Sequence, residues 1–410
     1  MSAIKKTRVL YVNHTGLVSG AEKVLLGILG KLNRERFEPI AICPSHGQLA
    51  DEIEQLGVER LPMPTLRARF SWRPDRALVA GIALVKMAGA LRRQIKIAAP
   101  DLIHANSVRA GIAATLAAAA TGIPVIWHVH DTLPKHPLSS VIRAFAFVAR
   151  NTQIIAVSRS TAKCFRGWFP LGGRICTIHN GVDLSRFSTE QPTDTSFREC
   201  IGLSKNDFLV CAVGQICVRK GLFELIDALS RIRHEAPHIH LAIVGKVVFP
   251  HEEEYLKTLY SVTERSALNG HVHFTGELSD VSPVLQAADL LVLNSLDEPF
   301  GLVLIEAMAS GTPVLATRVG GIPEIVTDSE NGWLVEKADT TALASKLLEL
   351  SKDRDRLARV AQCALKTVHS KFSIEAFQQK LEQLYARLEP IPDKHWSLPN
   401  RTALLKGTND

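Results

Sequence analysis

The sequence predicts an α/β protein built of two doubly wound domains that face a cleft. Short apolar runs, typical of buried parallel strands, alternate with longer helical segments along the chain. The alternation is interrupted by a polar, irregular stretch at residues 188–206 and then starts again. A chain of 410 residues is also too long for one small core and suits two domains of ordinary size.

The composition excludes several classes of protein. With 46% hydrophobic and 22% charged residues, the chain is ordinary for a globular protein. Its seven cysteines are scattered without a Cys-x-x-Cys pair, which argues against a disulfide framework or a zinc site and favours a reducing compartment. The segment before the first expected strand, residues 1–6, is short and mostly polar, unlike a secretory signal. No run of 18 apolar residues is uninterrupted, as a membrane-spanning helix would require. We therefore expect a cytoplasmic protein.

The first domain, expected over residues 1–190, begins with a strand followed by a glycine loop, residues 15–20, and a helix from Ala21. This layout favours phosphate binding through backbone N–H groups. The spacing is not Gly-x-Gly-x-x-Gly and no acidic ribose ligand follows, so a dinucleotide site is only weakly indicated and a plain tight turn is the alternative. The expected strands are 8–13, 39–43, 58–61, 101–104, 124–129, 153–157 and 175–178, with helices at 49–55, 78–91 and 108–120 and from Ser158.

A histidine closes the strand at residues 124–129. His130, followed by Asp131, stands at the carboxyl end of that strand, where open α/β sheets bind ligands. An imidazole there can hydrogen-bond a sugar hydroxyl or orient an acceptor, although a structural role is the alternative. His128 lies deeper in the same strand and is the weaker candidate.

The second domain, expected over residues 200–372, repeats the alternation. Its first strand leads into Gly214-Gln215 and then Arg219-Lys220-Gly221, where a helix should open. A lysine at a helix start can hold a phosphate as a point charge, and a solvated lysine is the alternative. The remaining strands are expected at 240–244, 272–274, 290–293 and 314–316, followed by a helical stretch over 341–389 that is broken near 371–373.

Residues 294–324 hold the densest set of candidate site residues. A helix starting near Phe300 or Gly301 is apolar nearly all round but contains Glu306, and a buried carboxylate requires a polar partner. Glu298 lies eight positions earlier, about 12 Å away if the stretch is helical. The free N–H groups of the helix N-terminus between them attract anions. This layout suits a nucleotide sugar, with hydroxyls at both ends and phosphate between; the alternative is a cap and a satisfied core carboxylate.

The positive charge is concentrated in residues 60–100. This window holds nine Arg and Lys against one acid, Asp75, whereas the whole chain carries only +7. Together with Phe70, Trp72 and an apolar helix, the charge suits an anionic membrane surface, and a solvated basic loop beside an ordinary amphipathic helix is the alternative. Nucleic acid is not an expected partner because aromatic residues are few and no binding motif is present.

The stretch Glu298-Pro-Phe-Gly…Glu306-Ala-Met-Ala-x-Gly-x-Pro-Val resembles the glutamate-x7-glutamate signature of the GT-B-fold retaining glycosyltransferases of family 4, also called glycosyl transferases group 1. The resemblance runs from residue 8 to about residue 388. It implies transfer of sugar, with retention, from a UDP- or GDP-sugar to an acceptor hydroxyl of a saccharide or a lipid-linked acceptor. Cell-surface polysaccharide or glycolipid synthesis is the implied process, at the inner face of the cytoplasmic membrane, with neither cofactor nor metal required. A last helix, 373–390, should cross back to the first domain, and residues 391–410 should be poorly ordered.

The resemblance also implies roles for individual residues. Glu298 would hold sugar hydroxyls and Glu306 the ribose, while His130 would orient the sugar or the acceptor. Lys220 would neutralise the leaving diphosphate. Two positions depart from the family, since Ser19 replaces the first glycine of Gly-Gly-x-Glu and Gln215 stands where an arginine is expected. A sugar-nucleotide epimerase and a non-catalytic nucleotide-sugar-binding protein remain alternatives. The full expected donor-binding set is Gly20, Gln215, Arg219, Lys220, Glu298, Phe300, Gly301, Leu302 and Glu306.

Overall fold

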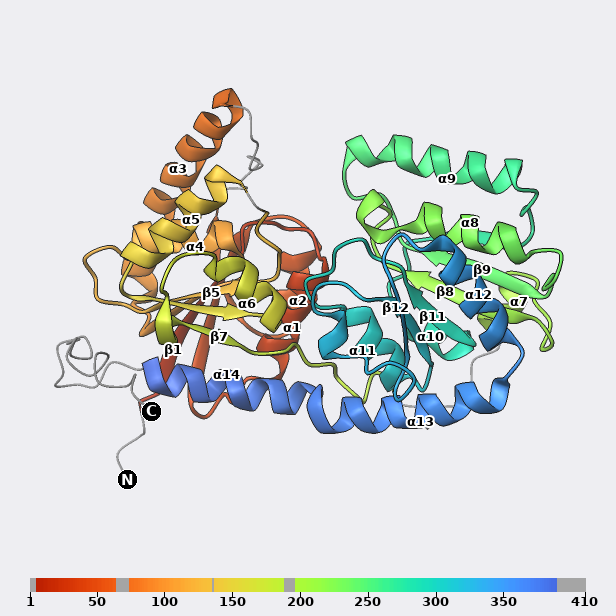
Figure 1. Ribbon diagram of the computed structural model, residues 1–410. Coiled ribbons are helices and arrows are strands. Elements are labelled where there is room, and N and C mark those ends of the chain that lie inside the picture. Colours follow the sequence, from red (N-terminus) through yellow and green to blue (C-terminus); the bar gives the residue numbers. More distant parts are fainter. Residues whose placement is uncertain (1–4, 64–73, 135, 188–195, 389–410) are drawn as a thin grey trace, which may run out of the picture.

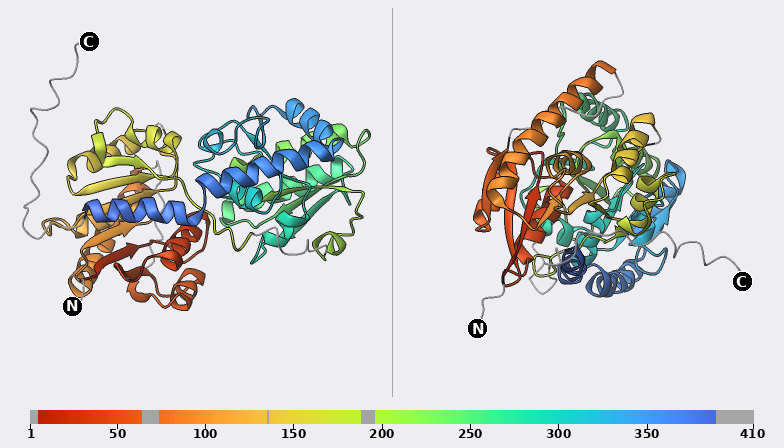
Figure 2. Two further views of the ribbon diagram at one scale, coloured as in Figure 1. Left: turned by 90° about the horizontal axis from the view of Figure 1, so that it is seen from below. Right: turned by 90° about the vertical axis from the view of Figure 1, so that its left-hand side faces the viewer.

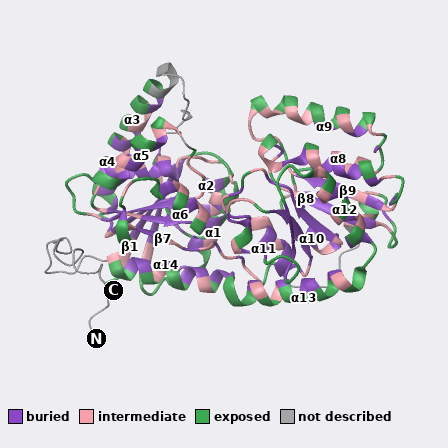
Figure 3. Cartoon of the chain, viewed as in Figure 1, coloured by how far each residue is buried: buried purple, intermediate pink, exposed green. Residues whose placement is uncertain are grey.

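The computed structural model has two lobes side by side, each a parallel sheet with helices on both faces (Figure 1). The structure describes residues 5–63, 74–134, 136–187 and 196–388, with only the backbone at 74–77 and 196. The buried residues concentrate in the strands and in the inner faces of the helices of each lobe (Figure 3). The predicted fold class, two doubly wound α/β domains, is confirmed.

Within the described residues, the first lobe has a seven-stranded sheet in the order β3-β2-β1-β4-β5-β6-β7. The strand order reverses between β1 and β4, and open α/β sheets bind their ligands at such a switch point. The strands are β1 (Thr7–Val12), β2 (Phe37–Pro44), β3 (Glu59–Met63), β4 (Leu102–Ala105), β5 (Val125–Val129), β6 (Thr152–Ala156) and β7 (Ile175–Thr177).

The second lobe repeats this design with six described strands in the order β10-β9-β8-β11-β12-β13. Its switch point lies between β8 and β11, so the loops that follow these strands share one edge of the sheet. The strands are β8 (Phe208–Val213), β9 (Ile239–Val244), β10 (Val272–Gly276), β11 (Leu290–Leu293), β12 (Val314–Thr317) and β13 (Trp333–Val335).

Helices cover both faces of each sheet because the strands are apolar on both sides. In the first lobe, α3, α4, α5 and α6 pack on one face and α1 and α2 on the other. In the second lobe, α8, α9 and α12 cover one face and α10 and α11 the other, while α13 contributes to both. The helices are α1 (Gly20–Lys31), α2 (Gln48–Gln55), α3 (Pro74–Ala98), α4 (Val108–Ala117), α5 (Pro137–Val148), α6 (Arg159–Arg166), α7 (Ser196–Cys200), α8 (Leu222–Ile232), α9 (Glu253–Arg265), α10 (Ser282–Ala287), α11 (Leu302–Ala309), α12 (Thr340–Ser351), α13 (Arg354–Lys371) and α14 (Ile374–Leu388), with short 3-10 turns η1 (Gly172–Arg174), η2 (Val218–Lys220), η3 (Pro250–Glu252) and η4 (Ile322–Glu324).

The last helix returns to the first lobe. α13 lies along the lower side of the second lobe and α14 along the lower side of the first (Figure 1), and the view from below shows the two helices crossing in front of the lobes (Figure 2). Phe377, Leu381 and Tyr385 of α14 are buried in the same apolar cluster as β1 and α1. The predicted crossover helix is therefore present and closes one face of the first sheet.

Some boundaries differ from the sequence-based expectation. The C-terminal helical stretch has a second break, because Asp353 caps α13 by accepting a hydrogen bond from the Arg356 N–H at 2.9 Å. Lys220 lies in the turn η2 rather than at the start of α8, which begins at Leu222. The predicted tail, 391–410, and much of the polar stretch at 188–206 lie outside the described residues, so the domain limits stay predictions.

Candidate active site

Glu298 is held at the carboxyl end of β11 by two basic residues of the loop after β8. Its side chain is buried, with Oε2 2.7 Å from Lys220 Nζ and 3.5 Å from an Arg219 guanidinium nitrogen. The Ser295 hydroxyl donates to the same oxygen at 3.1 Å. Burial raises the pKa of Glu298, but the positive charges of Lys220 and Arg219 outweigh it and leave the pKa below its ordinary value. The glutamate is therefore a buried anion with matched cations.

Backbone contact places these cations. Gly221 follows Lys220 with φ +60°, and a Cβ there would lie 2.1 Å from the carbonyl oxygen of Asn294. Only glycine fits this close approach to the end of β11. Arg219 also donates to the carbonyl oxygen of Asp297 at 3.0 Å. The loop after β8 is thus pressed against the loop after β11, at the switch point of the second sheet.

Gln215, which stands where the family has an arginine, does not join this cluster. Its side-chain amide donates to the Glu252 carboxylate at 2.7 Å. Both residues line a hollow of about 400 Å³ that also includes Arg219 and, from the first lobe, the exposed Asp131. Arg219 is therefore the second cation beside Lys220.

Glu306 differs from its expected environment. The sequence suggested a buried carboxylate with a polar partner, but the residue is half-buried. Within the described part of the chain its side chain has neither a hydrogen bond nor an ion pair. Because the position is only half-buried, the carboxylate does not need a protein partner to offset its desolvation. The prediction that Glu306 is buried was wrong, and a polar ligand as its partner stays a prediction.

The loop before α1 meets the start of α11 across the two lobes. A Cβ built on Gly20 would lie 3.4 Å from Leu302, so the two predicted donor-binding segments face each other. Gly301 precedes α11 with φ +106°. The Phe300 side chain points away from this contact, because its ring is buried against His179 and Phe372. Only the backbone of residue 300 is thus available to a ligand.

His130 stands at the end of β5, half-buried and close to other imidazoles. Its ring centroid lies 4.1 Å from that of His128, and its Nε2 is 3.1 Å from Asn106 Oδ1. Burial lowers the pKa of His130 to about 3, so the ring is neutral at pH 7. His128 is fully buried and contacts His104, so it lies deeper in the strand than His130, as predicted.

One contact between the lobes was not anticipated from the sequence. The Glu324 carboxylate, on η4 of the second lobe, accepts hydrogen bonds from the N–H groups of Arg159 and Ser160 at 2.9 and 3.0 Å. It also binds His179 Nε2 at 2.8 Å. A carboxylate at a helix N-terminus is favourable, so Glu324 caps α6 of the other lobe. Its place within the 294–324 stretch was the only sequence signal.

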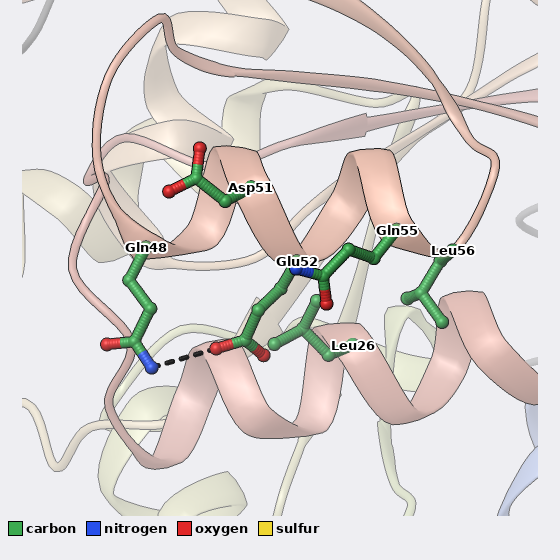
Figure 4. A pocket seen from close by; sticks show the side chains of 6 residues that line it. All are labelled: Leu26, Gln48, Asp51, Glu52, Gln55 and Leu56. Atoms are coloured by element: carbon green, nitrogen blue, oxygen red, sulfur yellow. Dashed lines mark hydrogen bonds between the residues drawn. The ribbon is translucent and has the colours of Figure 1, made fainter. Parts of the chain in front are cut away.

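The described residues form further hollows. A small cavity lies at the carboxyl ends of β8, β9 and β11 beside Lys220. A separate hollow of about 530 Å³ lies between α1 and α2, lined by Gln48, Asp51, Glu52 and Gln55 with two leucines (Figure 4), and shares none of these residues with the cleft. Over the described ranges, no group of three His, Cys, Asp or Glu side chains is arranged to hold a metal ion. In the same residues, no helix is long and apolar enough to cross a membrane.

Comparison with known proteins identifies the fold and the family. The protein-family model described as "Glycosyltransferase Family 4" matches residues 18–186 of this chain, and the family model described as "Glycosyl transferases group 1" matches residues 194–367. Among solved structures, HepE of Anabaena in complex with UDP and glucose superposes with a TM-score of 0.79 at 26% identity, covering 93% of this chain and 99% of that one.

The curated relatives of this chain are also glycosyltransferases. The chain is 25% identical to UDP-Gal:alpha-D-GlcNAc-diphosphoundecaprenol alpha-1,3-galactosyltransferase of Escherichia coli, over 94% of this chain and 98% of the relative. It is 31% identical to D-inositol 3-phosphate glycosyltransferase of Xylanimonas cellulosilytica, over 64% and 66% respectively. Matches to consecutive family models across both lobes, together with these relatives, show that the chain belongs to the GT-B-fold glycosyltransferases of family 4.

Proposed function

We propose that the protein transfers a sugar from a UDP- or GDP-sugar to an acceptor hydroxyl, with retention of anomeric configuration, in the synthesis of a cell-surface polysaccharide or glycolipid. The observation that supports this proposal most directly is the buried Glu298 anion paired with Lys220 at the switch point of the second sheet. The glycine loop of the first lobe faces the start of α11 nearby, where Gly20 meets Leu302. The UDP bound by HepE favours a uridine donor. The diphosphoundecaprenol acceptor in the E. coli relative's name favours a lipid-linked saccharide acceptor.

Each of these residues has a chemical task in the proposed reaction. Lys220 has three N–H donors, so it can bind a phosphate oxygen while keeping its bond to Glu298. Glu298 has acceptor positions left for sugar hydroxyls, and the unpartnered Glu306 can accept from a ribose. Backbone N–H groups of the Gly20 loop and of residues 300–302 complete the diphosphate site. Such fixed donors stabilise charge that develops in the transition state.

The bond changes need no protein base. The bond between the anomeric carbon and the diphosphate oxygen breaks, and the acceptor oxygen bonds to the same face of the sugar. The acceptor's proton passes to the departing diphosphate oxygen. His130 is neutral, so its task is to orient a hydroxyl rather than to supply a charge.

The first lobe also offers a surface for an anionic membrane. On α3, Leu78, Ile82 and Val85 recur at helical spacing, and their exposed fractions are 67%, 49% and 65%. Lys86 and Lys96 are exposed on the same helix. Apolar side chains bordered by lysines suit insertion at a lipid interface. The arginines at 67, 69 and 73 in the predicted basic window lie outside the described residues, and the side chain of Arg76 is not described.

Vesicle flotation tests the membrane surface. We expect the protein to float with phosphatidylglycerol-containing vesicles and the double variant Ile82→Asp, Val85→Asp to remain at the bottom. Tyr260→Asp is the matched control, since Tyr260 is half exposed on α9 of the other lobe. Equal flotation of both variants, or no flotation of the wild type at low salt, would contradict the surface assignment.

A thermal-shift panel followed by product analysis tests the donor site and the reaction. UDP, GDP, ADP, UDP-glucose, UDP-N-acetylglucosamine and GDP-mannose are offered at about 100 times Kd, where a ligand of the folded state stabilises it by about 2.7 kcal/mol. For a domain of this size, this corresponds to a Tm increase of about 5–10 °C. Conversion of the donor without an acceptor would indicate an epimerase, and binding without turnover a non-catalytic protein. No shift with any ligand would refute the donor site.

A further inference from the structure

A chain of buried side-chain hydrogen bonds runs from the loop before α1 to His130. Asn13 follows β1 and Asn106 follows β4, so both stand at the switch point of the first sheet, and both are fully buried. Asn106 Nδ2 donates to Asn13 Oδ1 at 3.1 Å. At the other end, Asn106 Oδ1 lies 3.1 Å from His130 Nε2. At the α1 end of this chain of hydrogen bonds, burial raises the pKa of the Glu22 carboxyl, while hydrogen bonds from Ser19 and Asn13 to that carboxyl lower its pKa.

Backbone carbonyls fix the direction of every bond in this chain. Asn13 Nδ2 donates to the carbonyl oxygen of Thr15 at 2.8 Å, and Asn106 Nδ2 donates to that of Ala21 at 3.1 Å. A carbonyl oxygen can only accept, so each amide nitrogen is identified by its carbonyl partner. The side-chain oxygen of Asn106 must therefore face His130. Rotating that amide would place its oxygen against two other oxygens.

This direction determines the hydrogen on the imidazole. Because Asn106 presents an oxygen, His130 Nε2 must carry the hydrogen and donate it. The neighbouring His128 ring belongs to a neutral, buried pair with His104 and brings no charge that would favour a second proton. A neutral ring with its hydrogen on Nε2 has a lone pair on Nδ1.

We propose that Asn106 is a positioning residue that holds His130 as the Nε2–H tautomer and leaves Nδ1 as a hydrogen-bond acceptor, so that His130 takes a hydroxyl that donates. The second half of this inference rests on the proposed function, because it needs a sugar in the cleft. A site built to accept from a hydroxyl discriminates against an analogue that lacks the hydroxyl. The chain also ties this selection to the Gly20 loop, since Asn106 bonds both Asn13 and the carbonyl of Ala21.

Nitrogen NMR of protein labelled with ¹⁵N-histidine tests the first half without any turnover. Long-range correlations distinguish the two neutral tautomers and the imidazolium, and the His130 signals are those missing from His130→Asn. We expect the Nε2–H tautomer at pH 7 in the wild type. The other tautomer, or an imidazolium, would overturn the proposal.

Variants test whether Asn106 is the cause. Asn106→Asp replaces a neutral acceptor with an anion, which should convert His130 to the imidazolium at pH 7. Asn331→Asp is the control, because Asn331 is also buried and bonded to a backbone carbonyl but lies in the other lobe. The control should leave the His130 signals unchanged. An unchanged His130 spectrum in folded Asn106→Asp would overturn the positioning role, and the wild-type spectrum decides the tautomer even if that variant does not fold.

Two substitutions of His130 test which nitrogen meets the substrate. An asparagine amide occupies the place of Nδ1, and a glutamine amide that of Nε2. With a donor identified in the panel, we expect His130→Asn to retain about fivefold more kcat/KM than His130→Gln, because one hydrogen bond to a neutral partner contributes roughly 1 kcal/mol. Equal losses, or the reverse order, would overturn the acceptor role of Nδ1. If no donor binds at all, the proposed function fails while the tautomer is still decided by NMR.

Discussion

Replacing Lys220 by methionine should reveal how strongly the buried Glu298 depends on its cation. Methionine keeps the aliphatic stem and removes the charge, so the change isolates electrostatics from packing. Removing one partner of a buried ion pair costs roughly 3–5 kcal/mol. Arg219 at 3.5 Å and Ser295 at 3.1 Å remain, so we expect a loss of about 2–3 kcal/mol in the free energy of unfolding at pH 7. Turnover should fall by about 10²-fold or more.

The stability loss should depend on pH with a definite sign. In the wild type, the pKa of Glu298 lies below its ordinary 4.5, so the ionised carboxylate stabilises the fold above that value and the contribution disappears as the pH falls through the lowered pKa. Without Lys220, burial is the largest influence that remains, so we expect the pKa of Glu298 to rise above the unfolded value. The carboxyl of the variant then destabilises the fold increasingly as the pH rises. The difference between the two proteins should be largest at pH 7 and narrow below about pH 4.5.

The double variant Lys220→Met, Glu298→Gln separates stability from catalysis. Removing both charges should restore most of the lost stability at pH 7, because no buried carboxylate remains unpaired. It should not restore turnover, since neither the cation nor the sugar-binding carboxylate is present. Urea unfolding at pH 7 and pH 4, with sugar transfer measured in parallel, provides both readouts. If the double variant is no more stable than Lys220→Met, the reasoning about a buried charge is refuted.

Three further substitutions test separate features. Glu306→Gln should weaken donor binding about tenfold or more while leaving the unfolding free energy unchanged, because the carboxylate has no protein partner and a hydrogen bond to a charged group contributes roughly 1.5–3 kcal/mol; equal UDP affinity by calorimetry would contradict its role. Glu324→Gln should destabilise the protein by about 1–2 kcal/mol at pH 7. Burial raises the pKa of Glu324, but the N–H groups that it caps bring the pKa below its ordinary value, so the loss should be smaller below pH 4. Urea unfolding at both pH values checks this. Gly221→Ala should lower stability well beyond Gly57→Ala, which has a similar φ of +63° but open space around it, because the new Cβ would meet Asn294; matching losses in urea unfolding would show that backbone strain alone is responsible.

Much of the fold was predictable because it depends on local pattern. Apolar runs of strand length and the polar residues that end them located the parallel sheets, and the carboxyl ends of those strands located the cleft. Lys220 and Glu298 were singled out from residue type and position, and Arg219 from the resemblance to the family. That the three meet in one ion cluster was not predicted, because it requires loops about 78 positions apart to share the switch point.

The structure differs from the sequence-based expectations where a side chain's surroundings come from segments that are distant in the sequence. The apolar sequence around Glu306 suggested full burial, but burial depends on which side of α11 meets the second lobe's core. The Phe300 ring packs against His179 and Phe372, and neither residue is near Phe300 in the sequence. Gln215 is paired with Glu252 from another loop. Periodicity and motif spacing contain no information on such pairings, since they are set by how the loops of neighbouring strands meet.

The two lobes contribute different electrostatics to the proposed reaction. In the second lobe, Lys220 and Arg219 are paired with a buried anion, so a diphosphate that shares these cations with Glu298 enters a site already organised for negative charge. In the first lobe, the candidate groups are backbone N–H groups and the neutral His130, whose hydrogen is directed by Asn106. A protonated His130 would add a charge beside the sugar and would lose the lone pair needed to accept a hydroxyl. In this proposal, the buried asparagine chain lets the first lobe select substrate by hydrogen-bond direction, while the second lobe supplies the charge that stabilises the leaving group.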